Sequence, residues 1–212
     1  ADAREFDLPP EPPHLPEVLD RIERSPVAWI AAIHGPALGG GAEIALACRY
    51  RIARPDATLG LPEVTLGVVP GAGGTQRLPR LVGIETALKM IPTGKPVSGM
   101  AAKEIGLVDA VDDDPVACAE MLNSEWLGRA VPVGELNSGD AEEALFDAAR
   151  QVARTRMRGQ QAPLRAIDLV ALSRSAPLAA GLKAERAVFL ELRQSDQARA
   201  LRHVFFAERG AR

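Results

Sequence analysis

The sequence predicts an α/β core followed by a helical C-terminal part, which divides the chain near residue 114 into regions 1–114 and 115–212. Two observations lead to this fold class. Before residue 114, short apolar runs alternate with glycine-rich turns in the order strand, helix, strand, which is the pattern of α/β proteins. After residue 114, apolar residues recur at helical spacing over long stretches, which predicts amphipathic helices.

The first half of the core is expected to contain three strands and two helices. Segment 1–26 is rich in proline and charge, and we expect one short helix in it, at 15–23. The continuous apolar run 27–33 predicts a strand that is covered on both faces. A buried helix is expected at 41–48, a strand at 49–54 and a further short strand at 58–61.

The rest of the chain is predicted to be mainly helical. Glycine turns and apolar spacing indicate one or two helices within 74–91. Ser98 has the residue type of an N-cap for a helix that runs to Ile105 and ends at Gly106, and a last strand is expected at 107–111. The C-terminal helices are expected at 115–127, 140–158, 164–173 and 177–209, the last with a break near Ser195.

The composition argues against several classes of partner. The 212 residues carry a formal net charge of −3 and only 4% aromatic residues, so neither a basic surface nor stacking rings favour nucleic acid. The long apolar run 27–48 is broken by glycines and contains Glu43, which argues against a membrane span. With no signal peptide at its start and only Cys48 and Cys118 as thiols, the chain is predicted to be cytoplasmic.

Two carboxylates are isolated among apolar residues. Glu43 lies one turn into the predicted helix 41–48, whose other residues are apolar or glycine, and Glu63 is the only charged side chain between Ala57 and Gln76. Buried carboxylates without neighbouring cations are costly, and function is the usual reason for keeping them. The alternative is that each pairs with a distant arginine or caps a backbone N–H.

Two glycine-rich turns flank these carboxylates in the sequence. The run 39–41 joins the first predicted strand to a helix N-terminus, where unpaired N–H groups and the helix dipole favour an anion. A peptide N–H of this turn is therefore a candidate donor to an oxyanion, although a triple glycine taken alone favours a tight turn packed against a strand. The run 71–74 lacks the spacing of a dinucleotide fingerprint and is interpreted as a close-packed turn. No metal site is expected, since His14, His34 and His203 lack ligand spacing.

Taken together, these segments resemble the crotonase (enoyl-CoA hydratase/isomerase) superfamily. Residues 27–43 (VAWIAAIHGPALGGGAE) resemble its central signature, and 61–63 (LPE) with 66–78 (LGVVPGAGGTQRL) resemble its second. Residues 93–98 and 102–108 continue the likeness through the core. The C-terminal runs 192–201 and 205–209 are similar to the end of the hydratase/isomerase part of multifunctional fatty-acid oxidation enzymes, in which an NAD-dependent 3-hydroxyacyl-CoA dehydrogenase follows.

The resemblance implies a ββα spiral core and the hydration of 2-trans-enoyl-CoA to 3-hydroxyacyl-CoA in fatty-acid β-oxidation, with enoyl-CoA isomerisation as a related activity. It implies no cofactor, because coenzyme A is part of the substrate. The residues it assigns are Glu43 and Glu63 as catalytic acids and bases, the N–H groups of Gly40 and Ala1 as the oxyanion hole, and Asp2, Ala3 and Gly71 as substrate-binding positions.

Two further expectations follow from the resemblance. Residues 1–6 resemble the stretch whose first residue supplies the second oxyanion N–H, so the family's earlier strands are expected to be missing from this chain. The helical C-terminal part is expected either to form a homotrimer or to belong beside a missing dehydrogenase part.

Two other functions stay open at this point. One is a different acyl-CoA reaction on the same oxyanion hole, such as dehalogenation or decarboxylation, against which the presence of both glutamates argues. The other is a non-catalytic, crotonase-like binding or assembly module. Turnover of crotonyl-CoA separates the enzyme from the module.

Overall fold

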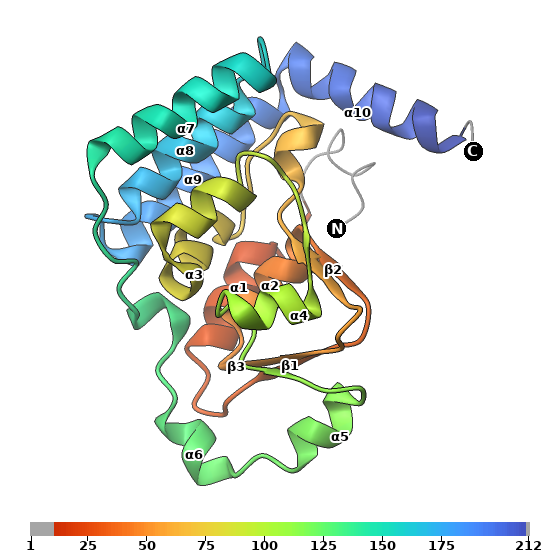
Figure 1. Cartoon of the computed structure of the whole chain (residues 1–212), viewed down its shortest axis with the longest axis vertical. Helices are drawn as coiled ribbons and strands as arrows, with labels where there is room; N and C mark the ends of the chain where they lie inside the picture. The colour runs from red at the N-terminus through yellow and green to blue at the C-terminus, as the bar shows by residue number, and fades with distance from the viewer. Residues whose placement is uncertain (1–10, 211–212) are drawn as a thin grey trace.

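Two small sheets form the centre of the core, which the computed structural model describes over residues 11–210 (Figure 1). In the first sheet, β1 (Ile30–Ile33), β3 (Tyr50–Ala53) and β6 (Ala110–Val111) lie parallel in the order β1-β3-β6. In the second, β2 (Pro36–Leu38) lies parallel to β4 (Thr58–Gly60), and β5 (Val97–Ser98) is antiparallel to β4.

Helix α2 (Gly40–Ala47) makes the crossover that a parallel pair requires. It lies in the chain between β1 and β3, whose register pairs Ile30 with Tyr50 and Ile33 with Ala53. The predicted order of strand, helix and strand is therefore confirmed. Ile52 and Ala53 in the central strand β3 are fully buried, which anchors the sheet to the helices.

The structure differs from the prediction at both outer strands of this sheet. The run 27–33 is not a strand covered on both faces: β1 begins only at Ile30, and Val27 and Trp29 are 71% and 52% exposed. The first backbone hydrogen bond between this run and the residues that lead into β3 is at 2.8 Å, from the N–H of Arg49 to the carbonyl of Trp29. The predicted strand 107–111 shrinks to the two residues of β6, because residues 107 and 108 donate their N–H groups to Ala102 at the end of a helix.

The helices follow the sequence more closely. Ser98 caps α4 (Gly99–Glu104) by accepting from the N–H of Ala101 at 3.2 Å, as predicted. The predicted helix 115–127 is two helices, because the side chain of Asn123 accepts from the N–H of Glu125 at 2.8 Å and starts a new one. The others are α1 (Leu15–Glu23), η2 (Glu63–Leu66), α3 (Gly74–Met90), α5 (Pro115–Glu120), α6 (Ser124–Arg129), η3 (Val133–Glu135), α7 (Glu143–Arg156), α8 (Ala162–Leu172), α9 (Leu178–Arg193) and α10 (Asp196–Gly210).

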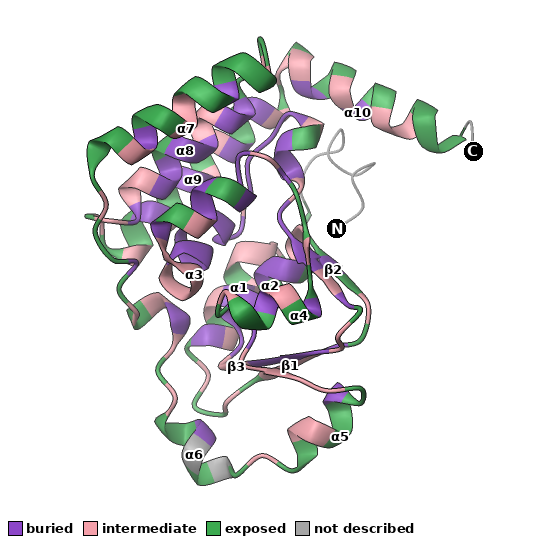
Figure 2. Cartoon of the chain, in the orientation of Figure 1, coloured by how far each residue is buried: buried purple, intermediate pink, exposed green. Residues whose placement is uncertain are grey.

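The C-terminal helices pack onto the core. Helices α7, α8 and α9 lie side by side, with α8 and α9 against α3 (Figure 1). One hydrophobic cluster contains residues of both parts, among them Ile91 from α3's end and Phe146, Ile167 and Val170 from α7 and α8, all fully buried. Figure 2 shows this burial toward α3 and the exposed outer face of α7. The boundary near residue 114 stays a prediction.

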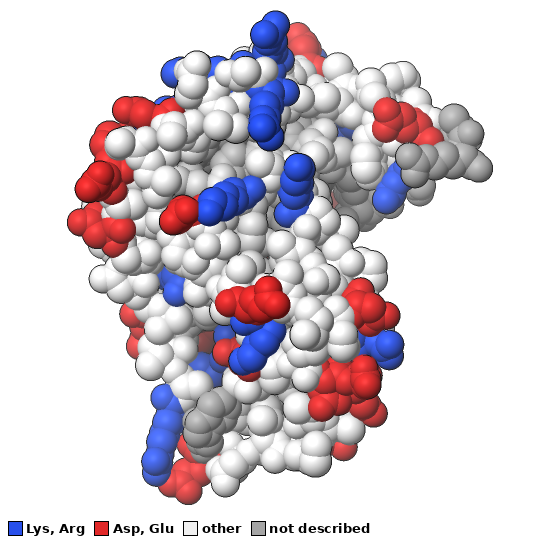
Figure 3. Space-filling view, viewed as in Figure 1, with Lys and Arg blue, Asp and Glu red and all other residues white. Residues whose placement is uncertain are grey.

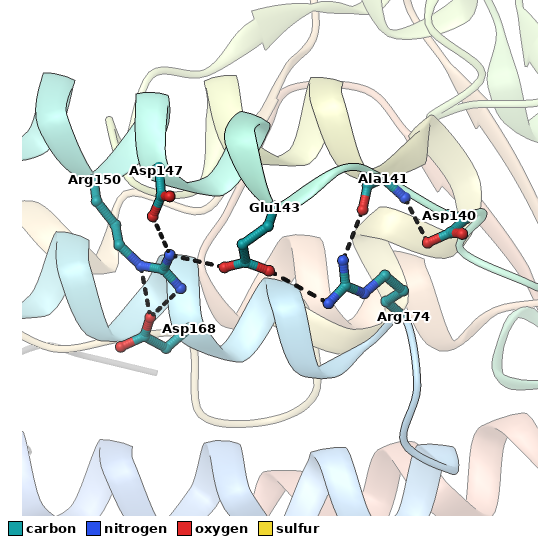
Figure 4. Close-up of polar contacts among 7 residues, drawn as sticks. All are labelled: Asp140, Ala141, Glu143, Asp147, Arg150, Asp168 and Arg174. Carbon is teal, nitrogen blue, oxygen red and sulfur yellow. Dashed lines mark hydrogen bonds and ion pairs between the residues drawn. The ribbon is translucent and has the colours of Figure 1, made fainter.

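Surface charges of both signs are interspersed on the face in Figure 3. One network joins α7 to α8: Arg150 forms ion pairs with Glu143 at 3.1 Å, Asp147 at 2.9 Å and Asp168 at 3.0 Å, and Glu143 also contacts Arg174 at 3.5 Å (Figure 4). Across residues 11–210, no helix is both long and apolar enough to cross a membrane.

Candidate active site

The side chain of Glu43 points from the first turn of α2 toward the start of α3. It is 4% exposed, and its Oε1 accepts from the N–H groups of Ala72 at 2.7 Å and Gly74 at 3.0 Å. The expectation that α2 is buried all round is wrong, since Gly41 and Ile44 are exposed. The carboxylate nevertheless lies on the buried side, where it accepts from the first N–H of α3 and from the N–H of Ala72 just before that helix.

Glu63 lies in the same region, at the first residue of η2. It is 7% exposed, and its Oε2 is buried without a hydrogen-bond partner. A methyl group built on Gly39 would lie 3.0 Å from Oε1 of Glu63, so this carboxyl stands directly beside the glycine turn. In the described part of the chain, no ion pair joins Glu43 or Glu63 to a basic side chain.

The environments of these two carboxyls separate their proton affinities. Burial raises the pKa of both. The two N–H bonds and the positive charges of Arg77 and Arg186 oppose that rise at Glu43. At Glu63, the negative charge of Glu43 adds to burial and lifts the pKa well above 4.5. Glu63 is therefore the group that holds a proton more strongly, and Glu43 is the one that ionises first.

The turn 39–41 brings backbone N–H groups to this place. Gly39 has a left-handed φ of 56° and donates its N–H to the carbonyl of Gly60 at 3.0 Å, which ties the turn to β4. Helix α2 begins at Gly40, so the N–H of Gly40 is a first-turn donor without an intrahelical acceptor. The structure thus brings three of the predicted positions together: Glu43, Glu63 and Gly40.

Of the other predicted positions, only Gly71 lies in the described part of the chain. Ala1, Asp2 and Ala3 lie outside the described residues. Gly71 packs beneath the ring of Phe189 on α9: a methyl group built on it would lie 2.6 Å from that ring. The carbonyl of Gly71 accepts from Arg186 at 3.5 Å. The interpretation of 71–74 as a close-packed turn at a helix start is borne out, since Gly73 caps α3 with a φ of 111°.

Sequence reasoning missed a third buried carboxylate, Glu185 on α9. It is fully buried and accepts from the N–H of Gly73, the N–H of Thr75 at 2.7 Å and the hydroxyl of Thr75 at 2.6 Å. Its neighbour Arg186 and the preceding Lys183 give it the sequence context of a surface glutamate. Only its contacts, more than 100 residues away in the chain, distinguish it.

A buried ion pair joins α1 to α3 beside this site. Nη2 of Arg77 lies 2.8 Å from Oε2 of Glu23, and Nη1 of Arg77 donates to the carbonyl of Ala72 at 3.0 Å. Glu23 also accepts from the N–H of Gly134 at 2.8 Å. Among the described residues, no group of three or more His, Cys, Asp or Glu side chains is arranged to hold a metal ion.

Known proteins are similar to this chain over most of its length. Residues 12–135 match the family model described as enoyl-CoA hydratase/isomerase. The peroxisomal bifunctional enzyme of Danio rerio is 41% identical over 100% of this chain and 30% of its own length. The glyoxysomal fatty acid beta-oxidation multifunctional protein MFP-a of Cucumis sativus is 41% identical over 91% of this chain and 28% of its own length. This chain therefore spans about three tenths of these relatives.

A solved structure supports the fold. The crystal structure of an enoyl-CoA hydratase/isomerase from Pseudoalteromonas atlantica T6c superposes with a TM-score of 0.66 at 24% identity, over 98% of this chain and 73% of that one. At that identity the likeness concerns the fold alone, which is the crotonase-like one expected from the sequence. The family model matches more than half of the chain, which establishes the family as well as the fold. This chain belongs to the enoyl-CoA hydratase/isomerase family.

Proposed function

We propose that this chain hydrates 2-trans-enoyl-CoA to 3-hydroxyacyl-CoA. The observation that carries the proposal is the pair of buried carboxyls, Glu43 and Glu63, whose surroundings push their pKa values apart. Hydration needs one group to take a proton from water and another to give one to carbon. A pair that shares one proton in a water-poor site is suited to both tasks.

The environments favour one assignment of the two roles. Glu43, held by two N–H donors and facing two guanidinium groups, is the base that accepts a proton from water as the hydroxyl adds to the β carbon. Glu63, whose pKa is raised well above 4.5, is the acid that delivers a proton to the α carbon. Transfer of the proton from Glu43 back to Glu63 restores the starting state.

Backbone amides would stabilise the enolate between these steps. The N–H of Gly40 at the start of α2 is the donor to the thioester oxygen, and the resemblance assigns the second donor to Ala1. Contacts of Asp2 and Ala3 with the CoA moiety, and of Gly71 with the water, remain proposals on the same basis. No cofactor is proposed, since the acyl-CoA is the substrate itself.

The test is hydration of crotonyl-CoA, which is measured as the loss of absorbance of its conjugated thioester. Glu43→Gln and Glu63→Gln should each lower kcat by about 10²–10⁴-fold while leaving the fold intact, since each removes one proton-transfer group. Glu104→Gln, on the exposed side of α4, is the matched control and should be silent. Near-normal turnover in either active-site variant would remove that residue from the mechanism.

Double-bond isomerisation provides a second comparison. It moves one proton between two carbons and needs only one carboxylate as a shuttle, so the two variants should differ in how much isomerisation they retain. A chain that binds crotonyl-CoA without any turnover would instead be a crotonase-like binding module.

The wider context rests on the relatives. Their names describe bifunctional or multifunctional proteins of fatty-acid β-oxidation in peroxisomes and glyoxysomes, and we propose that this chain acts in β-oxidation beside a dehydrogenase part. A homotrimer is the alternative assembly. The cytoplasmic location stays a prediction from the sequence, and fractionation of the source cells tests it against an organelle.

A further inference from the structure

The start of α3 divides its backbone donors between two buried carboxylates. The N–H groups of Ala72 and Gly74 go to Oε1 of Glu43, whereas those of Gly73 and Thr75 go to the two oxygens of Glu185. Four consecutive peptide units therefore alternate between a side chain of α2 and a side chain of α9. Neither carboxylate can shift without moving the donors of the other.

We propose that Glu185 is a positioning residue for hydration: it fixes residues 72–75 so that their other two N–H groups hold Glu43 in the reactive orientation. This inference rests on the proposed function. Both donors to Glu43 go to Oε1, which leaves Oε2 for the reacting water. Glu185 orients Glu43 through this loop, and its charge also adds to the raised pKa of Glu63.

The chemistry of the site requires a carboxylate at position 185. Gly73 donates to Oε1, while Thr75 donates to Oε2 through both its N–H and its hydroxyl. A carboxyl group has an oxygen at each end and keeps acceptor capacity there with or without its proton, whereas an amide has an NH₂ donor at one end. A glutamine of the same shape would turn its amide NH₂ toward one of these donors and leave that donor unpaired.

Close packing between α9 and α3 lets Glu185 reach this loop. A methyl group built on Gly181, one turn before Glu185, would lie 2.1 Å from Oε1 of Gln76. Gln76 donates in turn to the hydroxyl of Thr75 at 2.9 Å and to the carbonyl of Leu169 on α8 at 2.9 Å. The helical C-terminal part therefore holds the loop from two helices.

Cations fix the carbonyl groups of the same loop. Arg77 donates to the carbonyl of Ala72 at 3.0 Å, and Arg186 to that of Gly71 at 3.5 Å. Carboxylates hold the N–H groups of this loop, and guanidinium groups hold two of its carbonyl groups. Both kinds of backbone polar group are therefore fixed in position. Such preorganisation matters because a misplacement of about 1 Å in a catalytic group lowers rates about 10²-fold.

The experiment measures kcat and binding separately. In the 212-residue chain, Glu185→Gln should lower kcat for crotonyl-CoA about 10²-fold, with the Kd for the saturated analogue butyryl-CoA changed less than about twofold, because Glu185 does not touch the substrate. Glu191→Gln is the matched control on the exposed side of α9 and should change neither quantity. A purely structural role would lower the number of binding sites and leave kcat per site unchanged.

A second pair of variants covers the case in which Glu185→Gln does not fold. Thr75→Val removes the hydroxyl that donates to Glu185 and accepts from Gln76, and it should lower kcat about tenfold. Thr75→Ser keeps that hydroxyl and should leave kcat near its original value. Equal kcat in these two variants, or an unchanged kcat in a folded Glu185→Gln, would overturn the positioning role while the proposed hydration stands. Absence of turnover in the unsubstituted chain would overturn both.

Discussion

The buried pair of Glu23 and Arg77 offers a sharp test of how the site is supported. The two side chains are 7% and 1% exposed and meet at 2.8 Å and 3.2 Å, and Glu23 also accepts from Gly134 at 2.8 Å. The pair thus ties α1 to α3 and η3. Glu23→Leu removes the carboxylate and keeps the approximate volume of the side chain.

Glu23→Leu should lower the free energy of unfolding strongly, because it leaves the buried charge of Arg77 without its partner. Removal of one partner from a buried ion pair lowers stability by about 3–5 kcal/mol, and the unpaired N–H of Gly134 adds about 1 kcal/mol or more. Folded domains are stable by only about 5–15 kcal/mol. In the double variant Glu23→Leu/Arg77→Met no charge is stranded, so the loss should be clearly smaller than the sum of the two single losses.

Urea unfolding followed by circular dichroism measures these free energies. The single variants and the double variant form a cycle whose coupling free energy should be at least about 2 kcal/mol. Asp20→Asn, which breaks an exposed pair with Arg24 on the same helix, is the control and should change stability by less than about 1 kcal/mol. Additive losses, or a Glu23→Leu chain within about 1 kcal/mol of the original, would refute the reasoning.

Three further predictions concern pH, packing and surface charge. Burial and the charge of Glu43 raise the pKa of Glu185 from 4.5 to about 8. Between pH 4.5 and pH 8 the folded state therefore holds a proton that the unfolded state has lost. The free energy of unfolding should fall as pH rises through this range, by at most about 5 kcal/mol. Urea titrations at pH 5 and pH 8 test this, and Glu185→Gln should flatten the slope. Gly71→Ala should destabilise the chain by about 1–3 kcal/mol through overlap with Phe189, and Phe189→Leu should relieve part of that loss in thermal melts. Arg165→Met, which breaks an exposed pair with Glu191, should change stability by less than about 1 kcal/mol, and a larger loss would contradict the solvated character of that pair.

Local signals explain what the sequence could predict. The helix at 15–23, the Ser98 cap and the break near Ser195 each depend on residues within one or two turns of each other. Glu43 and Glu63 could be identified because apolar neighbours isolate them in the sequence. Strand β2, by contrast, begins at the proline of a Gly-Pro turn signal and becomes a strand only through pairing with β4, about 20 residues later.

Glu185 marks the limit of such reasoning. It lies in an amphipathic helix between charged neighbours, where sequence predicts a solvated side chain. Its burial arises only when α9 meets the start of α3, 110 or more residues earlier. The two carboxyls that we propose to react stand out in the sequence, whereas the residue that we propose holds one of them in place, Glu185, is recognised only in the folded chain.

The division of donors at α3 also gives the C-terminal helices a specific task. The first N–H groups of any helix lack intrahelical acceptors, and the positive end of its dipole favours anions. In α3 two carboxylates meet this need, one from the core and one from α9. Because both carboxylates bind the same short segment, the geometry at Glu43 depends on how α9 is seated. Helix α9 therefore acts on Glu43 in two ways, through this loop and through the charge of Arg186.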